Sequence, residues 1–245
     1  MDKKYNTASN QEAQAKATLL ELFKKCPIPD QDTLNNLALY LTRINVQNIL
    51  LLDGLYRQIL DKHGIIIEFG TRWGRNLALF SALRGIYEPF VRSRKIVGFD
   101  TFEGFISVGQ KDSKKNKKGD FSVTKGYDAY LDEIMLCHEI LSPISHIKKY
   151  ELIKGDATIK IHEYLKNNPE TIIALAYFDM NIYGPTKKCL EAIKDHMTKG
   201  GIIVFDQLNY HDHPGETIAF KEVFGNKYQV RRWPLSQSVS YIVLE

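Results

Sequence analysis

The sequence predicts an α/β fold in which a mostly parallel sheet carries helices on both faces, preceded by a helical segment. Short, uniformly apolar runs rich in β-branched residues alternate with amphipathic stretches from residue 64 onwards. Strands that lack polar alternation are usually covered on both faces, as in parallel sheets. A chain of 245 residues, 44% of them hydrophobic and 25% charged, is also long enough to bury a core without disulfide or metal support.

The N-terminal part is predicted to be helical. Apolar residues at helical spacing predict a helix over residues 11–25, which ends before Pro27 and Pro29. A second helix is expected from Asp32, a residue type that suits an N-cap, to about Leu52. We interpret these helices as a cap on the domain that follows.

Five apolar runs are the predicted core strands. They occupy residues 64–70, 95–100, 150–156, 171–179 and 200–206. Helices are expected between them, near residues 75–85, 127–140, 157–167 and 185–198. Two runs near the C-terminus, KYQVRRW and SVSYIVLE, predict antiparallel strands that meet through Pro234. The chain is thus divided into a helical cap, residues 1–60, and an α/β domain, residues 61–245.

A polar segment, residues 109–126, interrupts this alternation and has five lysines between positions 111 and 118. Its composition is typical of a solvated, mobile loop. Because it follows a strand end, where ligands bind in such folds, it also suits a basic lid that attracts an anionic substrate. The sequence leaves both interpretations open.

Every predicted core strand ends in or beside an acidic residue. These residues are Glu68, Asp100, Asp156, Asp179 and Asp206. Ligands of open α/β sheets bind outside the carboxyl ends of the strands, so the five carboxylates are expected to converge on one crevice. Like charges in a crevice repel one another, although any one of them alone could cap a helix. A cationic ligand, a metal ion or several ribose hydroxyls would relieve this repulsion.

The turn after the first strand, Glu68 to Gly74, is expected to approach a ligand closely. Its glycines are spaced G-x-x-x-G, whereas a dinucleotide pyrophosphate is bound by G-x-G-x-x-G. Glu68 would repel a pyrophosphate but suits an amine or a sulfonium. Asp100 is placed to accept hydrogen bonds from a ribose, and Asp156 to reach an adenine amino group. Together these features indicate S-adenosylmethionine.

The candidate cofactor-binding residues belong to the strand ends and the turns that follow them. They are Glu68, Gly70, Thr71, Arg72, Trp73, Gly74, Asn76, Asp100, Thr101, Phe102, Gly155, Asp156, Ala157 and Asp179. For Trp73, stacking on the cofactor and packing under the turn are equally compatible with the sequence.

Five segments together resemble the macrocin O-methyltransferase family. They are Glu68 to Gly74, GFDTFEGF (98–105), KGDA (154–157), YFDMNIYGPT (177–186) and GGIIVFDQLNYHDHPGE (200–216). The resemblance spans about residues 64–225, and its most specific parts are FDTFEGF and the closing PGE. It implies a Rossmann-like class I S-adenosylmethionine-dependent methyltransferase with a seven-stranded sheet, often oligomeric. Such enzymes methylate a sugar hydroxyl of a nucleotide sugar, a glycan or a glycosylated metabolite.

In metal-using members of that family, acids at the positions of Asp179 and of residues 206 and 207 hold Mg²⁺ beside the accepting hydroxyl. This chain has Asp206 followed by Gln207, and Asn181 where many relatives have a second aspartate. The candidate metal ligands are therefore Asp179, Asp206 and Gln207, in a less anionic site. Mg²⁺ binds mainly through carboxylates, so we expect metal binding to be weakened.

Methyl transfer to a hydroxyl needs a group that lowers the pKa of the acceptor or takes its proton. Asp179 is the first candidate base and Asp206 the second. His211 and His213 are alternatives because an unperturbed imidazole titrates near neutral pH, although their position is also typical of exposed loop histidines. The candidate catalytic residues are thus Asp179, Asp206 and His211.

Two other functions are compatible with parts of the sequence. Tyr183 and Lys187 match the Tyr-x-x-x-Lys pattern of NAD-dependent oxidoreductases and epimerases, but Pro185 is expected to start the helix and leave Tyr183 outside it. Asn181 and Gln207 would also suit a non-catalytic module that binds S-adenosylmethionine and transfers no methyl group.

Composition and charge exclude several classes of partner. A net charge of +4 without a basic stripe gives no reason to expect nucleic acid. Residues 172–178, the longest strongly apolar stretch, are too few to span a membrane, and the N-terminus lacks the apolar core of a secretory signal. The cysteines, Cys26, Cys137 and Cys189, are expected to be reduced. We therefore expect a cytoplasmic protein with a carbohydrate-type acceptor, and the resemblance adds a homo-oligomer.

Overall fold

The computed structural model describes residues 9–236 and 238–245, which form two units. The first unit ends at Asn48, and the second spans Ile49–Glu245. We describe each by itself. The division of the chain at residue 60 into a cap and a catalytic domain stays a prediction.

The N-terminal unit is helical, as predicted, but its second helix is interrupted. It contains α1 (Asn10–Lys24), α2 (Asp30–Thr33), the 3-10 helix η2 (Leu34–Tyr40) and the start of α3 (Arg43–Arg57). The expected continuous helix from Asp32 to Leu52 is therefore wrong. Leu41 is extended, and both the backbone N–H and the hydroxyl of Thr42 donate to Asn45 Oδ1, at 2.9 and 2.7 Å. Short polar side chains that bond nearby backbone in this way compete with helix continuation.

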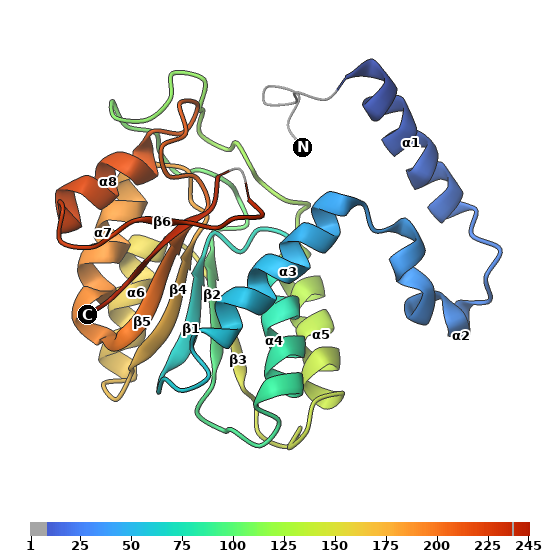
Figure 1. Cartoon of the computed structure of the whole chain (residues 1–245), viewed down its shortest axis with the longest axis horizontal. Coiled ribbons are helices and arrows are strands. Elements are labelled where there is room, and N and C mark those ends of the chain that lie inside the picture. Colours follow the sequence, from blue (N-terminus) through green and yellow to red (C-terminus); the bar gives the residue numbers. More distant parts are fainter. Residues whose placement is uncertain (1–8, 237) are drawn as a thin grey trace. The chain divides into compact units, whose positions relative to one another are not determined.

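The second unit contains a seven-stranded sheet of order β3-β2-β1-β4-β5-β7-β6 (Figure 1). Its strands are β1 (Ile65–Phe69), β2 (Ile96–Asp100), β3 (Tyr150–Lys154), β4 (Ile173–Phe178), β5 (Met197–Phe205), β6 (Arg231–Arg232) and β7 (Ser240–Val243). The first five strands are parallel, and β7 pairs antiparallel with both β5 and β6. The predicted mostly parallel α/β sheet with an antiparallel end is confirmed.

Helices cover both faces of the sheet (Figure 1). They are α4 (Arg75–Tyr87), α5 (Tyr127–Ile140), α6 (Ala157–Asn167), α7 (Tyr183–Ile193), the 3-10 helix η3 (Lys194–His196) and α8 (Gly215–Phe224). Alternate strand residues point to opposite faces. Ile66 and Tyr177 thus join a core with α4 and α5, whereas Ile67 and Phe178 join a core with α6, α7 and α8. Within the described residues, no helix combines the length and apolar character of a membrane-spanning segment.

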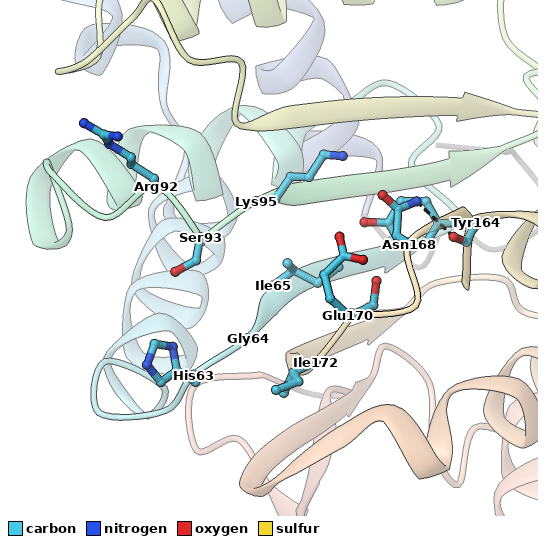
Figure 2. A pocket seen from close by; sticks show the side chains of 11 residues that line it. His63, Gly64, Ile65, Arg92, Ser93, Lys95, Tyr164, Asn168, Glu170 and Ile172 are labelled. Atoms are coloured by element: carbon cyan, nitrogen blue, oxygen red, sulfur yellow. Dashed lines mark hydrogen bonds between the residues drawn. The ribbon is translucent and has the colours of Figure 1, made fainter. Parts of the chain in front are cut away.

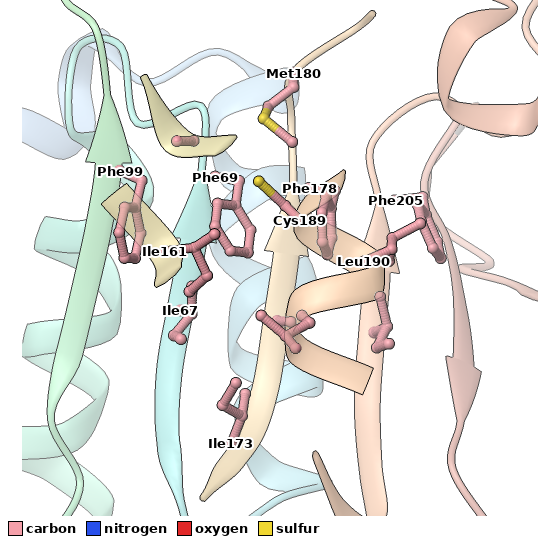
Figure 3. Packing of buried hydrophobic residues seen from close by; sticks show 14 of the residues in the cluster. Ile67, Phe69, Phe99, Ile161, Ile173, Phe178, Met180, Cys189, Leu190 and Phe205 are labelled. Carbon is pink, nitrogen blue, oxygen red and sulfur yellow. The ribbon is translucent and has the colours of Figure 1, made fainter. Parts of the chain in front are cut away.

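A row of four aromatic rings lies across the second core just below the carboxyl ends of the strands (Figure 3). Phe69 packs on Phe99 and Phe178 with ring centroids 5.1 and 4.8 Å apart, and Phe178 packs on Phe205 at 5.6 Å. Phe69, Phe178 and Phe205 are the last residues of their strands. The row therefore brings the residues that follow these strands to one level of the sheet edge.

Candidate active site

The carboxylates at the strand ends are brought together at the carboxyl edge of the sheet, as predicted. The backbone N–H of Asp179 donates to Phe69 O at 2.8 Å, and that of Asp206 donates to Phe178 O at 3.0 Å. The charges of Asp206 and Glu68 both raise the pKa of Asp179, after burial as the main cause. Asp156 differs because its side chain accepts from Thr158 N–H at 2.9 Å and thus caps α6.

Asp100 is fixed by the two loops beside it. Its Oδ2 accepts from the N–H of Arg72 at 2.7 Å, and its Oδ1 accepts from the N–H of Phe102 at 2.6 Å. Both donors have left-handed backbone, with φ of 49° and 60°, which non-glycine residues adopt at some strain. Each carboxylate oxygen keeps acceptor capacity for a ligand. This is the geometry expected of a carboxylate that binds a diol.

Glu68 lies on β1 and is 1% exposed. Its Oε1 accepts from Asn76 Nδ2 at 2.8 Å, so two of the candidate site residues are in contact. Burial, and to a smaller extent the neighbouring charge of Asp100, raise the pKa of Glu68 to about 8. A cation bound at this edge would favour the ionised form of Glu68.

The turn after β1 requires glycine at position 70. Gly70 has φ of 92°, and a Cβ there would lie 2.1 Å from the carbonyl oxygen of Asp179. Gly74 is also left-handed and precedes α4. The backbone segments that follow β1 and β4 are thus closely packed against each other. The site beside them is therefore shaped by side chains.

Trp73, in the turn after β1, packs against Tyr127 of α5. Its ring meets that of Tyr127 edge to face at 4.7 Å, and its carbonyl oxygen accepts from the Tyr127 hydroxyl at 3.0 Å. The indole is nevertheless 43% exposed. Stacking of Trp73 on a cofactor stays a prediction, as do the ligand contacts of Thr101, Gly155 and Ala157.

Oxygen atoms line the ends of β4 and β5. Asp179 is followed by Asn181, and Asp206 by Gln207. Tyr177 donates its hydroxyl to Asp206 Oδ1 at 3.0 Å. The side-chain oxygens of Asn181 and Gln207 are buried and accept no hydrogen bond. The site therefore offers two carboxylates and two unused amide oxygens.

This donor set fits a hard cation such as Mg²⁺, which prefers oxygen ligands. The predicted ligands Asp179, Asp206 and Gln207 all belong to it. In residues 9–236 and 238–245, no three His, Cys, Asp or Glu side chains are grouped to hold a metal. Any cation here would consequently depend on the amide oxygens as well as on the two carboxylates.

Glu216 is a site residue that the sequence analysis did not assign. It is 0% exposed near the start of α8, and its carboxylate accepts from the N–H groups of Met180, Asn181 and Gln207 at 3.1, 3.1 and 3.2 Å. Burial, and then the charge of Asp206, raise its pKa to about 8. The PGE segment was its only sequence signal.

The histidines of the loop after β5 differ in burial. His211 is exposed, and its catalytic role stays a prediction. His213 is buried, and its ring lies 6.0 Å from Tyr210 and 6.2 Å from Phe121. Burial lowers the pKa of His213. The buried histidine thus packs between two loops of the site.

The lysine-rich loop, residues 109–126, is attached to the elements that follow β4 and β5. Asp112 is buried and accepts from the N–H of Tyr183 at 2.6 Å and from that of Gly109 at 2.7 Å. Lys115 pairs with Asp212 at 2.6 Å. Because Tyr183 and Asp212 lie just beyond Asp179 and Asp206 in sequence, the loop is held beside the ends of β4 and β5.

Tyr183 and Lys187 lie on one helix face, which corrects the expectation that Pro185 would separate them. Helix α7 begins at Tyr183 rather than at the proline. The Tyr183 hydroxyl and Lys187 Nζ both donate to Glu222 Oε2, at 2.7 and 2.8 Å. Glu222 also pairs with Lys111. These groups therefore join the lysine-rich loop to α7 and α8.

A cavity of about 310 Å³ lies at the opposite, amino-terminal edge of the sheet (Figure 2). Its lining includes His63, Arg92, Lys95 and Glu170. Lys95 is already paired with Glu151. None of the predicted site residues lines this cavity, so it is separate from the carboxylate site.

The chain is similar to methyltransferases of known structure. It shares 41% identity with CalS11, a calicheamicin methyltransferase, over 98% of this chain and 95% of that one, with a TM-score of 0.94. The apo structure of CalS11, a TDP-rhamnose 3'-O-methyltransferase of calicheamicin biosynthesis, gives 40% identity over 98% and 97% of the chains and a TM-score of 0.87. The O-methyltransferase NovP, at 14% identity over 83% and 81% and a TM-score of 0.59, shares the fold.

Fold and site together define the protein as a methyltransferase. The chain belongs to the family of methyltransferases that includes CalS11. No protein-family model matches the chain, and no curated protein does.

Removing the Asp112 carboxylate is expected to release the lysine-rich loop. Asp112→Ala leaves the N–H of Tyr183 without its acceptor, a loss on the order of 1–3 kcal/mol. Trypsin should then cleave within residues 111–118 about tenfold faster. Asp212→Asn is the control, because an exposed ion pair contributes about 0–1 kcal/mol. Equal cleavage rates in the two variants would contradict the anchoring role.

Glu68 makes the ligand-free protein less stable as the pH rises. The folded protein keeps a proton on Glu68 up to about pH 8, whereas the unfolded chain loses it near 4.5. The free energy of unfolding therefore falls between these values, by on the order of a few kcal/mol. Urea unfolding at several pH values should show a flatter profile for Glu68→Gln than for the wild type. The exposed Glu133→Gln is the control, and an unchanged slope in Glu68→Gln would disprove the assignment.

Proposed function

We propose that this protein is an S-adenosylmethionine-dependent O-methyltransferase that methylates a hydroxyl of a nucleotide-activated sugar. The observation that carries the proposal is the gathering of buried and half-buried carboxylates at the carboxyl edge of the sheet, beside a basic loop. Similarity to CalS11, which acts on TDP-rhamnose, supports the sugar acceptor.

The cofactor half of the site consists of Glu68, Asp100 and the turn at residues 70–76. When bound, S-adenosylmethionine supplies a methyl group on a positively charged sulfur. Asp100, held by two backbone N–H groups, is oriented to accept from ribose hydroxyls. Glu68 provides a buried carboxylate that a nearby cation would stabilise in its ionised form.

The acceptor half consists of Asp179 and Asp206 at the ends of β4 and β5. Burial and the neighbouring carboxylates raise the pKa of Asp179. A carboxylate with a raised pKa is a stronger base, so Asp179 is suited to take the proton of the accepting hydroxyl at its carboxylate oxygen. Mg²⁺ held by Asp179, Asp206 and Gln207 would supply a Lewis acid that lowers the pKa of the same hydroxyl.

The lysine-rich loop favours an anionic acceptor over a neutral glycoside. Its Lys111 and Lys115 are used in ion pairs that attach the loop. Lys114, Lys117 and Lys118 are exposed and form no ion pair with a described carboxylate. They are thus available to a diphosphate, which a nucleotide sugar carries and a neutral glycoside lacks.

Cofactor binding is expected to depend on Asp100. Calorimetry should detect binding of S-adenosylhomocysteine to the wild type and at least tenfold weaker binding to Asp100→Ala, because hydrogen bonds to a charged group contribute about 1.5–3 kcal/mol. Asp61→Ala, at an exposed carboxylate, should bind as the wild type does. Absence of heat with the wild type and either form of the cofactor would refute the proposed function.

Asp179→Asn should lose methyl transfer. Isotopically labelled methyl donor and a panel of nucleoside diphosphate sugars, TDP-rhamnose among them, would be assayed for labelled product. Loss of a general base lowers turnover by roughly 10²–10⁴-fold. The far-UV circular dichroism spectrum and the thermal unfolding midpoint serve as the folding control. Equal turnover by the variant would exclude Asp179 as the base, and no product from the wild type would favour a non-catalytic module.

The three unpaired lysines should discriminate between acceptors. Replacing Lys114, Lys117 and Lys118 together by alanine is expected to raise KM for a nucleoside diphosphate sugar about tenfold, since each exposed charge contributes up to about 1 kcal/mol. The KM for a neutral methyl glycoside should stay the same. A parallel change for both acceptors would show that the loop does not bind the diphosphate.

A further inference from the structure

The loops after β4 and β5 carry the acceptor-side groups, yet neither loop is part of a regular element. Residues 179–182 precede α7, and residues 206–214 precede α8. Asn181 has left-handed backbone with φ of 61°. A non-glycine residue persists in this conformation only where its surroundings hold it. The surroundings of Asn181 therefore hold the first of these loops in place.

Glu216 contacts both loops at once. Its Oε1 accepts from the N–H groups of Met180 and Asn181, and its Oε2 accepts from the N–H of Gln207. Both oxygens are thus occupied by backbone donors. The carboxylate is buried completely, and the preceding Gly215 has no room for a Cβ, which would lie 2.4 Å from the backbone nitrogen of Tyr183. Helix α8 therefore begins tightly against the loop after β4.

Only a carboxylate can satisfy these three donors at that place. An amide side chain of the same shape has one acceptor oxygen and presents its NH₂ group to the remaining backbone N–H. Buried backbone donors without a partner are destabilising. Since its oxygens are used in this way, Glu216 is not itself available as the base.

We propose that Glu216 is a positioning residue, which joins the loops after β4 and β5 and thereby aims the oxygens of Asn181 and Gln207 at the accepting hydroxyl. The effect of Glu216 on turnover rests on the proposed function. The three hydrogen bonds that Glu216 accepts from the two loops, which we call the clamp, do not rest on it. The unused amide oxygens of both residues are the groups whose direction the clamp sets. Asp179 and Asp206 belong to the same two loops and are aligned with them.

Two measurements test this proposal. Amide proton NMR should show the N–H resonances of Asn181 and Gln207 shifted downfield in the wild type, as expected for N–H groups that donate to a carboxyl oxygen. In Glu216→Gln the Gln207 resonance should move upfield most. The kcat for methyl transfer should fall about 10–100-fold, because small misplacements of reacting groups have effects of this size, while S-adenosylhomocysteine affinity stays within about threefold.

Control variants separate positioning from a general loss of structure. Glu133→Gln, an exposed substitution of the same type on α5, should leave both the amide resonances and kcat unchanged. Glu216→Asp keeps two acceptor oxygens but is shorter, so its kcat should lie between those of the wild type and Glu216→Gln. If Glu216→Gln fails to fold, the wild-type resonances and Glu216→Asp still provide the test.

The outcomes distinguish the clamp from the proposed function. Wild-type amide resonances at ordinary positions would overturn the clamp. Displaced resonances in Glu216→Gln together with an unchanged kcat would overturn its positioning role. Downfield wild-type resonances in a protein that methylates no sugar would support the clamp and overturn the proposed function instead.

Discussion

The structure depends on how several buried carboxylates are kept together at one edge of a sheet. Like charges in a low-dielectric setting repel strongly, and removing them from water adds a further penalty. Two of these groups are stabilised by backbone donors: Asp100 accepts two N–H bonds and Glu216 accepts three. Burial raises the pKa of these two acids and also that of the others, Glu68 and Asp179. Asp100 and Glu216, which accept backbone hydrogen bonds, are suited to hold the loops around them in place. Glu68 and Asp179 are suited to respond to a ligand or a proton.

The parallel part of the sheet was predictable from the sequence because its strands lie in largely apolar runs that end in or beside an acid. Those two features alone place the carboxylates at one edge, since parallel strands share a direction. Helix boundaries were less predictable where a side chain accepts a hydrogen bond from a backbone N–H group at the end of a helix. The break at Leu41 depends on Thr42 bonding to Asn45, and the start of α7 at Tyr183 depends on Asp112, a residue 71 positions earlier.

The sequence names candidate residues for the cofactor half of the site, which stay predictions, and it leaves Glu216 out of the other half. Cofactor-side residues lie close in sequence to glycines and strand ends, so their spacing carries information. Glu216 bonds to groups 9, 35 and 36 residues away, and only the folded chain brings these together. The lysine-rich loop presents the same difficulty, because its composition indicates solvation while its attachment depends on α7 and on Asp212.

The amide side chains at residues 181 and 207 fit the presence of Glu216. A carboxylate at either position would add a charge to a cluster that already contains Asp179, Asp206 and Glu216, and would raise their pKa values further. The amides keep the oxygen donors and remove the charge. Glu216, in turn, raises the pKa of Asp179, which makes that carboxylate a better proton acceptor. The same buried acid can therefore hold the two loops in place and strengthen the base between them.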